Sequence, residues 1–213
     1  MADTHDTTST FVPFDAGSPV QATSRHLPHW QQGGCAYFVT FRLADAVAED
    51  KQQQWKAEQK QWLVSHPEPW SEAVRAEYHH LFTGQMQQWL DAGHGACWLR
   101  DPAMAALVAG ALAHFHGSRY ALDDFVVMPN HVHVLVTPLK EHELSEILHS
   151  WKSFTAKQIN HALGHAGAVW QDESFDHVVR SAAQLERFRD YIRNNPVAAH
   201  LREGEYSLGQ GAR

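Results

Sequence analysis

The sequence predicts an α+β fold: a ferredoxin-like antiparallel sheet with helices packed on one face, plus a helical insert. Segments rich in aromatic and β-branched residues alternate with longer segments whose apolar residues recur at helical spacing. Their order is strand, helices, strand, strand, helix, strand, helix. Apart from the extra helices, this is the β-α-β-β-α-β plan, in which an antiparallel sheet carries its helices on one side.

The first half of the chain supplies one strand, the insert and a buried helix. Residues 34–43 are aromatic and β-branched and predict the first strand. Residues 45–92 are long, polar and helix-prone, with prolines at 67 and 69, so two helices joined at this break are expected. Residues 102–116 begin with Pro102 and are apolar on more than one face, which predicts a buried helix.

The second half contains a hairpin and two helices. The expected elements are a hairpin of residues 120–127 and 131–136 about a turn at 128–130, an amphipathic helix over 141–163, short β-like stretches at 169–170 and 177–179, and a last helix over 182–194 that Pro196 halts.

The chain has 213 residues, which suits one domain, and no apolar run approaches the roughly 20 residues that span a bilayer. We expect no membrane partner and, because the N-terminus lacks the pattern of a secretory signal, a cytoplasmic protein.

Cys35 and Cys97 lack metal-site spacing and are expected to be buried thiols. The expected organisation is a disordered tail (1–24), the domain (25–203, with its helical insert at about 45–92) and a C-terminal tail (204–213).

The net charge of −7 argues against an indiscriminate DNA binder, which is normally basic. The acidity is uneven along the chain. Residues 1–139 hold 8 Lys and Arg against 14 Asp and Glu, whereas residues 140–202 hold 8 of each. The C-terminal third is therefore neutral.

Two histidines have a spacing that suits a metal. In a strand, residues i and i+2 point to the same face, so His131 and His133 present their imidazoles side by side. An isolated His-x-His also arises by chance in a chain with 17 histidines. A functional metal site needs further ligands and a nucleophile or activated water.

The last helix offers both a ligand and a nucleophile. Tyr191 lies one position off the apolar stripe, and Asn195 follows four residues later on the same helix face. The Asn195 amide oxygen could serve as a third ligand and the Tyr191 phenol as a nucleophile. Two structural alternatives stay open: Tyr191 as an amphipathic residue at the core edge, and Asn195 as a helix C-cap before Pro196.

Four blocks of the sequence resemble a known family. They are MPNHVHVLV at 128–136, ILHSWKSFTAKQIN at 147–160, VWQDESFDHVVR at 169–180 and DYIRNNPV at 190–197. Together and in this order they resemble the HUH single-tyrosine transposases of the insertion-sequence 200-like type, and most of all the REP-associated tyrosine transposases. The resemblance runs from about residue 25 to 203 and does not extend to residues 45–92.

The resemblance implies a metal-dependent enzyme that cuts and rejoins single-stranded or hairpin DNA. His131, His133 and Asn195 would hold Mg²⁺ or Mn²⁺ against the scissile phosphate. Tyr191 would attack phosphorus, giving a 5′-phosphotyrosine and a free 3′-hydroxyl, and the reverse attack would rejoin DNA. The protein would act as a monomer or homodimer.

Three basic residues in the matching blocks are expected to contact DNA phosphates. They are Lys152, Lys157 and Arg180, which lie off the apolar stripes, although each could equally be a solvated surface charge. Asp176 and His177 fall in the same blocks without an assigned role.

Two other enzyme classes use His-x-His but need different neighbours. Histidine-triad hydrolases require a third histidine at position 135, and HxHxDH metallo-hydrolases require Asp-His at 135–136. This chain has Leu135 and Val136 there, so both fail. The remaining alternative is a DNA-binding regulator on the same scaffold without transposition activity.

Overall fold

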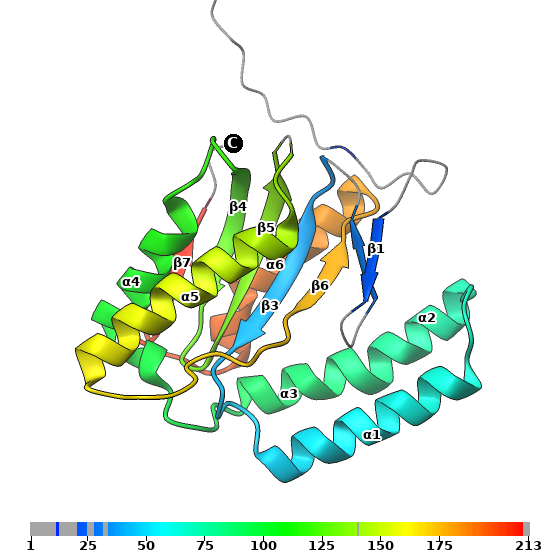
Figure 1. Ribbon diagram of the computed structural model, residues 1–213, viewed down its shortest axis with the longest axis horizontal. Helices are drawn as coiled ribbons and strands as arrows, with labels where there is room; N and C mark the ends of the chain where they lie inside the picture. Colours follow the sequence, from blue (N-terminus) through cyan, green and yellow to red (C-terminus); the bar gives the residue numbers. More distant parts are fainter. Residues whose placement is uncertain (1–11, 13–20, 25–27, 32–33, 140, 211–213) are drawn as a thin grey trace, which may run out of the picture.

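A five-stranded antiparallel sheet forms the centre of the protein (Figure 1). The computed structural model describes residue 12 and residues 21–24, 28–31, 34–139 and 141–210. The strands of the sheet are β3 (Tyr37–Arg42), β4 (Tyr120–Val127), β5 (His131–Pro138), β6 (Phe175–Val178) and β7 (Ser207–Gly209), in the order β6-β3-β5-β4-β7. Every neighbouring pair is antiparallel, as expected for a ferredoxin-like sheet. The α+β class is therefore confirmed.

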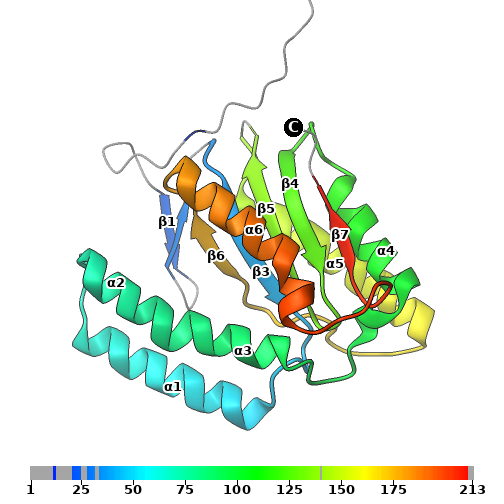
Figure 2. The same ribbon diagram turned by 180° about the vertical axis from the view of Figure 1, so that it is seen from behind.

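Helices cover both faces of the sheet. Helices α4 (Pro102–Ala113) and α5 (Leu144–Leu163) lie on one face, as expected, and α6 (Ala182–Ala198) lies on the other (Figures 1 and 2). The physical reason is visible in β3, where all six residues are buried. Val39 packs with the core under α4 and α5, whereas Phe38 packs with the core under α6. A strand that is apolar on both sides needs a cover on both sides, which corrects the expectation of helices on one face only.

Helix α6 begins at Ser181, whose hydroxyl accepts a hydrogen bond from the Gln184 N–H at 3.1 Å. Pro196 does not halt it, because the helix continues to Ala198. The missing proline N–H removes only one bond near the C-terminal end, and the Ala199 N–H still donates to the Asn195 carbonyl at 3.0 Å. Asn195 therefore lies inside the helix and is not a C-cap.

Two ion pairs attach α6 to strand β4. Arg189 pairs with Asp123, and Arg193 pairs with Asp124 at 2.6 Å. The Asp124 side chain is 1% exposed, so the second pair is held away from solvent. Both arginines lie on the same helix as Tyr191, so these pairs also fix the part of α6 that carries the tyrosine.

The helical insert consists of two antiparallel arms (Figure 1). One arm is α1 (Glu49–Ser65), and the other runs through α2 (Glu72–Tyr78), the π-helical segment η1 (His79–Gly84) and α3 (Gln85–Asp91). The arms meet through aromatic rings, since Trp62 lies 5.2 Å from Trp70 and 5.3 Å from Tyr78 between ring centroids. The break expected near residues 66–69 is the turn between the arms. After the second arm, a 3-10 turn, η2 (Trp98–Arg100), leads into α4.

The sheet extends beyond the expected domain end at residue 203, because β7 pairs with β4 through Phe125↔Gly209, Val126↔Leu208 and Val127↔Ser207. Near the start, β1 (Gln21–Ser24) and β2 (Pro28–Gln31) form a separate two-stranded sheet, so the expected boundary at 24–25 falls between paired strands. Most of the tail expected at 1–24 lies outside the described residues. Among the described helices, none is both long and apolar enough to cross a membrane.

Strand β7 depends on a glycine. A Cβ at Gly209 would lie 2.1 Å from atoms of the Phe125 ring, which is itself buried. We expect Gly209→Val to lower the free energy of unfolding by about 1–3 kcal/mol, because the added carbons overpack this contact. Urea unfolding measures the change.

The control is Leu208→Ala, at a neighbouring side chain that is 43% exposed and should change stability by no more than about 0.5 kcal/mol. Equal unfolding midpoints for Gly209→Val and wild type would show that β7 does not pack on Phe125 in this way.

Candidate active site

The two histidines of β5 lie side by side on the face that α6 covers. Arg42 of β3 is paired in register with His131, and Thr40 with His133. Both imidazoles are completely buried, and their Nε2 atoms lie 3.0 Å apart. The i, i+2 spacing therefore directs two ring nitrogens at one point, as the sequence predicts.

Neighbouring side chains fix the orientation of both rings. The Nδ1 of His131 lies 2.7 Å from the Asn130 amide oxygen, which can only accept, so this Nδ1 carries the proton. The Nδ1 of His133 lies 2.8 Å from the Thr40 hydroxyl. The Gln87 amide nitrogen lies 3.2 Å from His133 Nε2 and donates to it. Both Nε2 atoms therefore carry lone pairs on the same side of the site, and the lone pair of His133 accepts from Gln87; a cation between the rings would compete with Gln87 for it.

Burial keeps the two rings neutral. It lowers the pKa of His131 to about 3, and the positive charge of Arg42 adds to the effect. Burial, followed by repulsion from His131, lowers the pKa of His133 well below its ordinary value. Neutral imidazoles are the form that binds metals, so the pair stays ready to bind a metal into the acidic range.

Helix α6 brings Tyr191 and Asn195 to this pair. The Asn195 amide nitrogen donates to the Tyr191 hydroxyl oxygen at 3.0 Å. The Tyr191 ring meets His133 edge-on at 5.2 Å and Phe38 at 5.7 Å between centroids. Asn195 is 2% exposed, and its amide oxygen has no hydrogen-bond partner. The i, i+4 pair expected from sequence therefore shares one face with the histidines.

The environment of Tyr191 favours the neutral phenol. Burial raises the pKa of Tyr191, the negative charge of Asp91 raises it further, and the hydrogen bond from Asn195 acts in the opposite direction. A nucleophilic phenol in this position must therefore lose its proton as it reacts, or when a cation arrives nearby.

Two residues of the insert complete the site, and sequence reasoning missed both. Gln87 and Asp91 lie one turn apart on α3, and the Gln87 amide nitrogen donates to the Asp91 carboxylate at 2.9 Å. Gln87 reaches His133, and Asp91 acts on Tyr191 through its charge. Nothing in residues 85–91 marks them as functional, because their role depends on how the insert packs against the sheet.

Arg42 is a third residue that the sequence did not single out. Its side chain is 2% exposed, and two of its nitrogens, Nε and one terminal nitrogen, have no hydrogen-bond partner. The guanidinium lies over the Phe175 ring, 5.3 Å from its centroid, and burial lowers its pKa to about 10. A buried cation therefore stands between the histidine pair and the edge strand β6.

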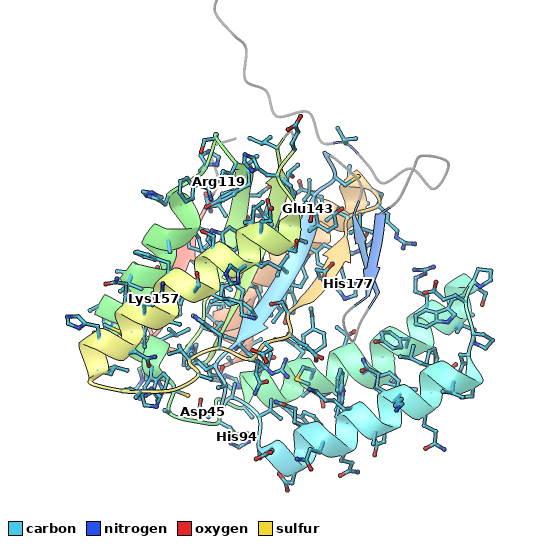
Figure 3. The ribbon with its side chains drawn as sticks, viewed as in Figure 1. Asp45, His94, Arg119, Glu143, Lys157 and His177 are labelled. Carbon is cyan, nitrogen blue, oxygen red and sulfur yellow. The ribbon has the colours of Figure 1, made fainter. Side chains whose placement is uncertain are left out.

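The basic residues expected to contact DNA lie in two different places. Lys152 and Lys157 are on α5, on the opposite side of the sheet from α6, where Lys157 is exposed and Lys152 donates to the Asp172 carbonyl at 2.7 Å (Figure 3). Arg180 follows β6 and, with Asp176 and His177, lines a groove between β6 and the insert. The structure thus brings Arg180 to the Tyr191 side of the sheet and the two lysines to the other.

The donors at the site fit a divalent metal ion. Two imidazole nitrogens point at one position, and the unpartnered Asn195 oxygen is a third donor from the adjacent helix. Within the described residues, no group of three or more His, Cys, Asp or Glu side chains is arranged to hold a metal. The set is therefore two imidazoles and an amide, and burial would favour neutral ligands over an unpaired charge.

Comparisons with known proteins show which family one segment of the chain resembles. Residues 112–195 match the family model described as Transposase IS200 like. The match contains both histidines, Tyr191 and Asn195, so the resemblance seen in the four sequence blocks is confirmed here. The insert lies outside it.

One solved structure similar to the chain is a REP-associated tyrosine transposase bound to a REP hairpin. The two chains are 18% identical, and the alignment covers 83% of this chain and 74% of that one with a TM-score of 0.43. Among curated proteins, none matches.

The buried histidines predict a specific loss of stability in acid. In the unfolded chain each imidazole takes up a proton near pH 6.5, but the folded site resists this, so acid favours unfolding. Each such histidine costs about 1.4 kcal/mol for every pH unit below that value. We expect His131→Gln/His133→Gln to lose this part of the pH dependence, measured by urea unfolding of chelator-treated protein at about pH 7.5 and about pH 5.5.

His149→Gln, which removes an exposed histidine of α5, is the control and should retain the wild-type pH dependence. If the double variant loses as much stability as wild type on acidification, the two rings are not held neutral by burial.

Asp91 predicts a shift in the titration of the candidate nucleophile. Removing its charge in Asp91→Asn should lower the Tyr191 pKa, although burial will still hold that pKa above the ordinary tyrosine value. Phenolate absorbance, taken as a difference from the same protein carrying Tyr191→Phe, measures the shift.

Asp190→Asn removes an exposed carboxylate from α6 and should have a smaller effect than Asp91→Asn. An unchanged Tyr191 titration in Asp91→Asn would mean that the insert carboxylate does not act on the phenol.

Proposed function

We propose that the protein is a metal-dependent DNA transposase or endonuclease that cuts and rejoins single-stranded or hairpin DNA through Tyr191. The observation that carries this proposal is the meeting of a phenol, an amide and two neutral imidazoles on one face of the sheet, inside the segment that matches the IS200-like transposases. Each group has a chemical role there, and the unpartnered Asn195 oxygen is available as a donor to a cation.

The proposed step is a transfer of one phosphodiester bond. The Tyr191 oxygen attacks phosphorus, a new oxygen–phosphorus bond forms, and the bond from phosphorus to the 3′-oxygen breaks. The phenol proton leaves during the attack, and the departing 3′-oxygen takes up a proton to become a free hydroxyl. The 5′-phosphotyrosine conserves the bond, so a 3′-hydroxyl can reverse the step and rejoin DNA without an external energy source.

His131, His133 and Asn195 are the residues proposed to hold Mg²⁺ or Mn²⁺. When bound, the ion would polarise a non-bridging phosphate oxygen and offset the negative charge that develops on phosphorus. The hydrogen bonds from Asn130 and Thr40 support this role, because they fix the ring orientation in which both Nε2 atoms face the same point.

Asn195 would also position the nucleophile. Its amide nitrogen donates to the Tyr191 oxygen, while its amide oxygen remains available on the other side. One side chain can therefore couple the position of the phenol to that of the ion. This coupling is what an i, i+4 tyrosine–asparagine pair supplies and what a tyrosine alone does not.

Among the basic residues, Arg180 is proposed to contact DNA near the reacting phosphate, since it lies on the Tyr191 side of the sheet. Lys152 and Lys157 are proposed only as contacts to more distant phosphates, because α5 covers the opposite face. Phosphate contacts of either kind would position the DNA without reading its sequence.

A covalent adduct tests the proposal. Wild-type protein incubated with labelled hairpin oligonucleotides and Mn²⁺ or Mg²⁺ should give a protein–DNA adduct on a denaturing gel, and chelator or Tyr191→Phe should abolish it. Asn195→Ala should reduce adduct formation by about 10- to 100-fold, because it removes both a ligand and a positioning group.

Tyr206→Phe is the matched control, since Tyr206 packs against the same core as α6 but has no contact with the histidines. It should form adduct as wild type does. If wild type binds the hairpins and forms no adduct with any of them, the protein is a DNA-binding regulator and the catalytic assignment of Tyr191 is wrong.

A further inference from the structure

A groove separates the insert from the edge of the sheet. It has a volume of about 630 Å³ and is lined on one side by α1, α2 and η1, and on the other by β6 and the start of α6. Figure 3 labels His177 on β6, the strand at this edge. The volume is in the range of small-ligand sites, so it suits a few nucleotides of one strand and excludes a duplex.

A chain of aromatic rings in contact lines this groove and is called its aromatic floor; Trp55 and Phe82, inside the chain, are buried and meet edge to face. From the sheet outward, Phe175 lies 5.7 Å from Trp55, Trp55 lies 6.0 Å from Phe82, Phe82 lies 5.2 Å from Tyr78, and Tyr78 lies 5.0 Å from Trp70, all between centroids. Phe175, Tyr78 and Trp70 are only partly buried. The outer rings therefore offer surface on which flat partners can stack.

Arginines stand along the same groove. Arg75 projects from the insert, and Arg180 and Arg187 come from the opposite wall, while the acidic residues that line it are Glu68 and Asp176. Arg75 lies close enough to Arg180 that its charge, after burial, lowers the Arg180 pKa. Like charges that face each other across an open space favour an anion between them.

Two chains of packed side chains connect the wall of the groove with the candidate active site. Phe175, at its inner end, lies under the guanidinium of Arg42, which neighbours His131 in the sheet. On the other side, His177 lies 6.4 Å from the Phe188 ring, which stacks on Phe38 at 4.4 Å, and Phe38 touches Tyr191. Only this layer of packed rings separates Tyr191 from the groove, so a strand attached at Tyr191 would reach the groove over the surface of this layer.

We propose that the groove binds unpaired nucleotides of the DNA strand that adjoins the cleaved phosphate, with bases stacked on the aromatic floor and phosphates paired with Arg75, Arg180 and Arg187. This inference rests on the proposed function, because it takes DNA as the substrate, and adds a site built by the insert. Stacked aromatics beside cations are the combination that holds single-stranded nucleic acid with little sequence preference.

Binding in the absence of metal tests the groove separately from cleavage. With chelator present, the full-length protein is titrated against two fluorescent DNA hairpins, one blunt and one with a single-stranded extension, at several salt concentrations. Wild type should bind the extended hairpin more tightly. Trp70→Ala should weaken that binding by at least about fivefold and leave blunt-hairpin binding unchanged, because one stacking contact is lost.

The arginines give a second readout that does not depend on the aromatic packing of the insert. Arg180→Ala/Arg187→Ala changes two exposed residues, so the fold should persist even if Trp70→Ala perturbs the arms. For the extended hairpin, the slope of log affinity against log salt should fall in magnitude by about 1.4, the value for two lost single-strand phosphate contacts.

Two controls match these changes outside the groove. Phe154→Ala removes an aromatic ring that is 51% exposed on α5, and Lys60→Ala removes an exposed cation of α1 that does not line the groove. Both should bind the two hairpins as wild type does.

Wild-type affinity and salt slope for the extended hairpin in the arginine variant would overturn the groove proposal. The same conclusion follows if extension adds nothing to wild-type binding. Neither result affects Tyr191 chemistry, which the adduct assay decides independently. Conversely, a groove effect without any adduct would leave the groove as a DNA site of a regulator.

Discussion

Burial of both faces of the β3–β5 pair is the constraint on which the rest of the structure depends. Because the residues of β3 alternate between two apolar cores, the sheet needs α4 and α5 on one side and α6 on the other. The second core places two imidazoles under a helix, where desolvation keeps them neutral and where a helical tyrosine can reach them. A sheet covered on one face only would leave this pair in water.

The helical insert contributes residues to the candidate site in addition to those of the sheet and α6. Its α3 supplies the amide that reaches His133 and the carboxylate that acts on Tyr191. Its helices α1 and α2 and the segment η1 form one wall of the aromatic groove. An addition outside the segment matched to the family thus contacts the candidate active site at one end and extends away from it at the other. The proposed chemistry lies in the matched segment, and the proposed groove for the strand lies between that segment and the insert.

Local pattern was sufficient to predict the hairpin of β4 and β5, the faces of α5 and the pairing of Tyr191 with Asn195, because each depends on residues close in sequence. It was insufficient where distant segments meet. Strand β7 has three residues and is defined by its contact with β4, and Gln87 acquires a role only when α3 packs beside the end of the sheet. The prediction that Pro196 halts the last helix was wrong. A proline near the end of a helix removes only one backbone hydrogen bond, and the burial of one face of α6 can offset that loss.

The ion pairs of Arg189 and Arg193 with β4 have a consequence for the order of events on DNA. If the proposed covalent link forms, two ion pairs to strand β4 would hold this part of α6, and with it Tyr191, beside the histidines. The attached 5′ end would then be a stationary tether, and any exchange of partners would have to come from the free 3′ end changing place. Under the proposed function, the DNA would rearrange around a fixed attachment point while the protein scaffold stays in place.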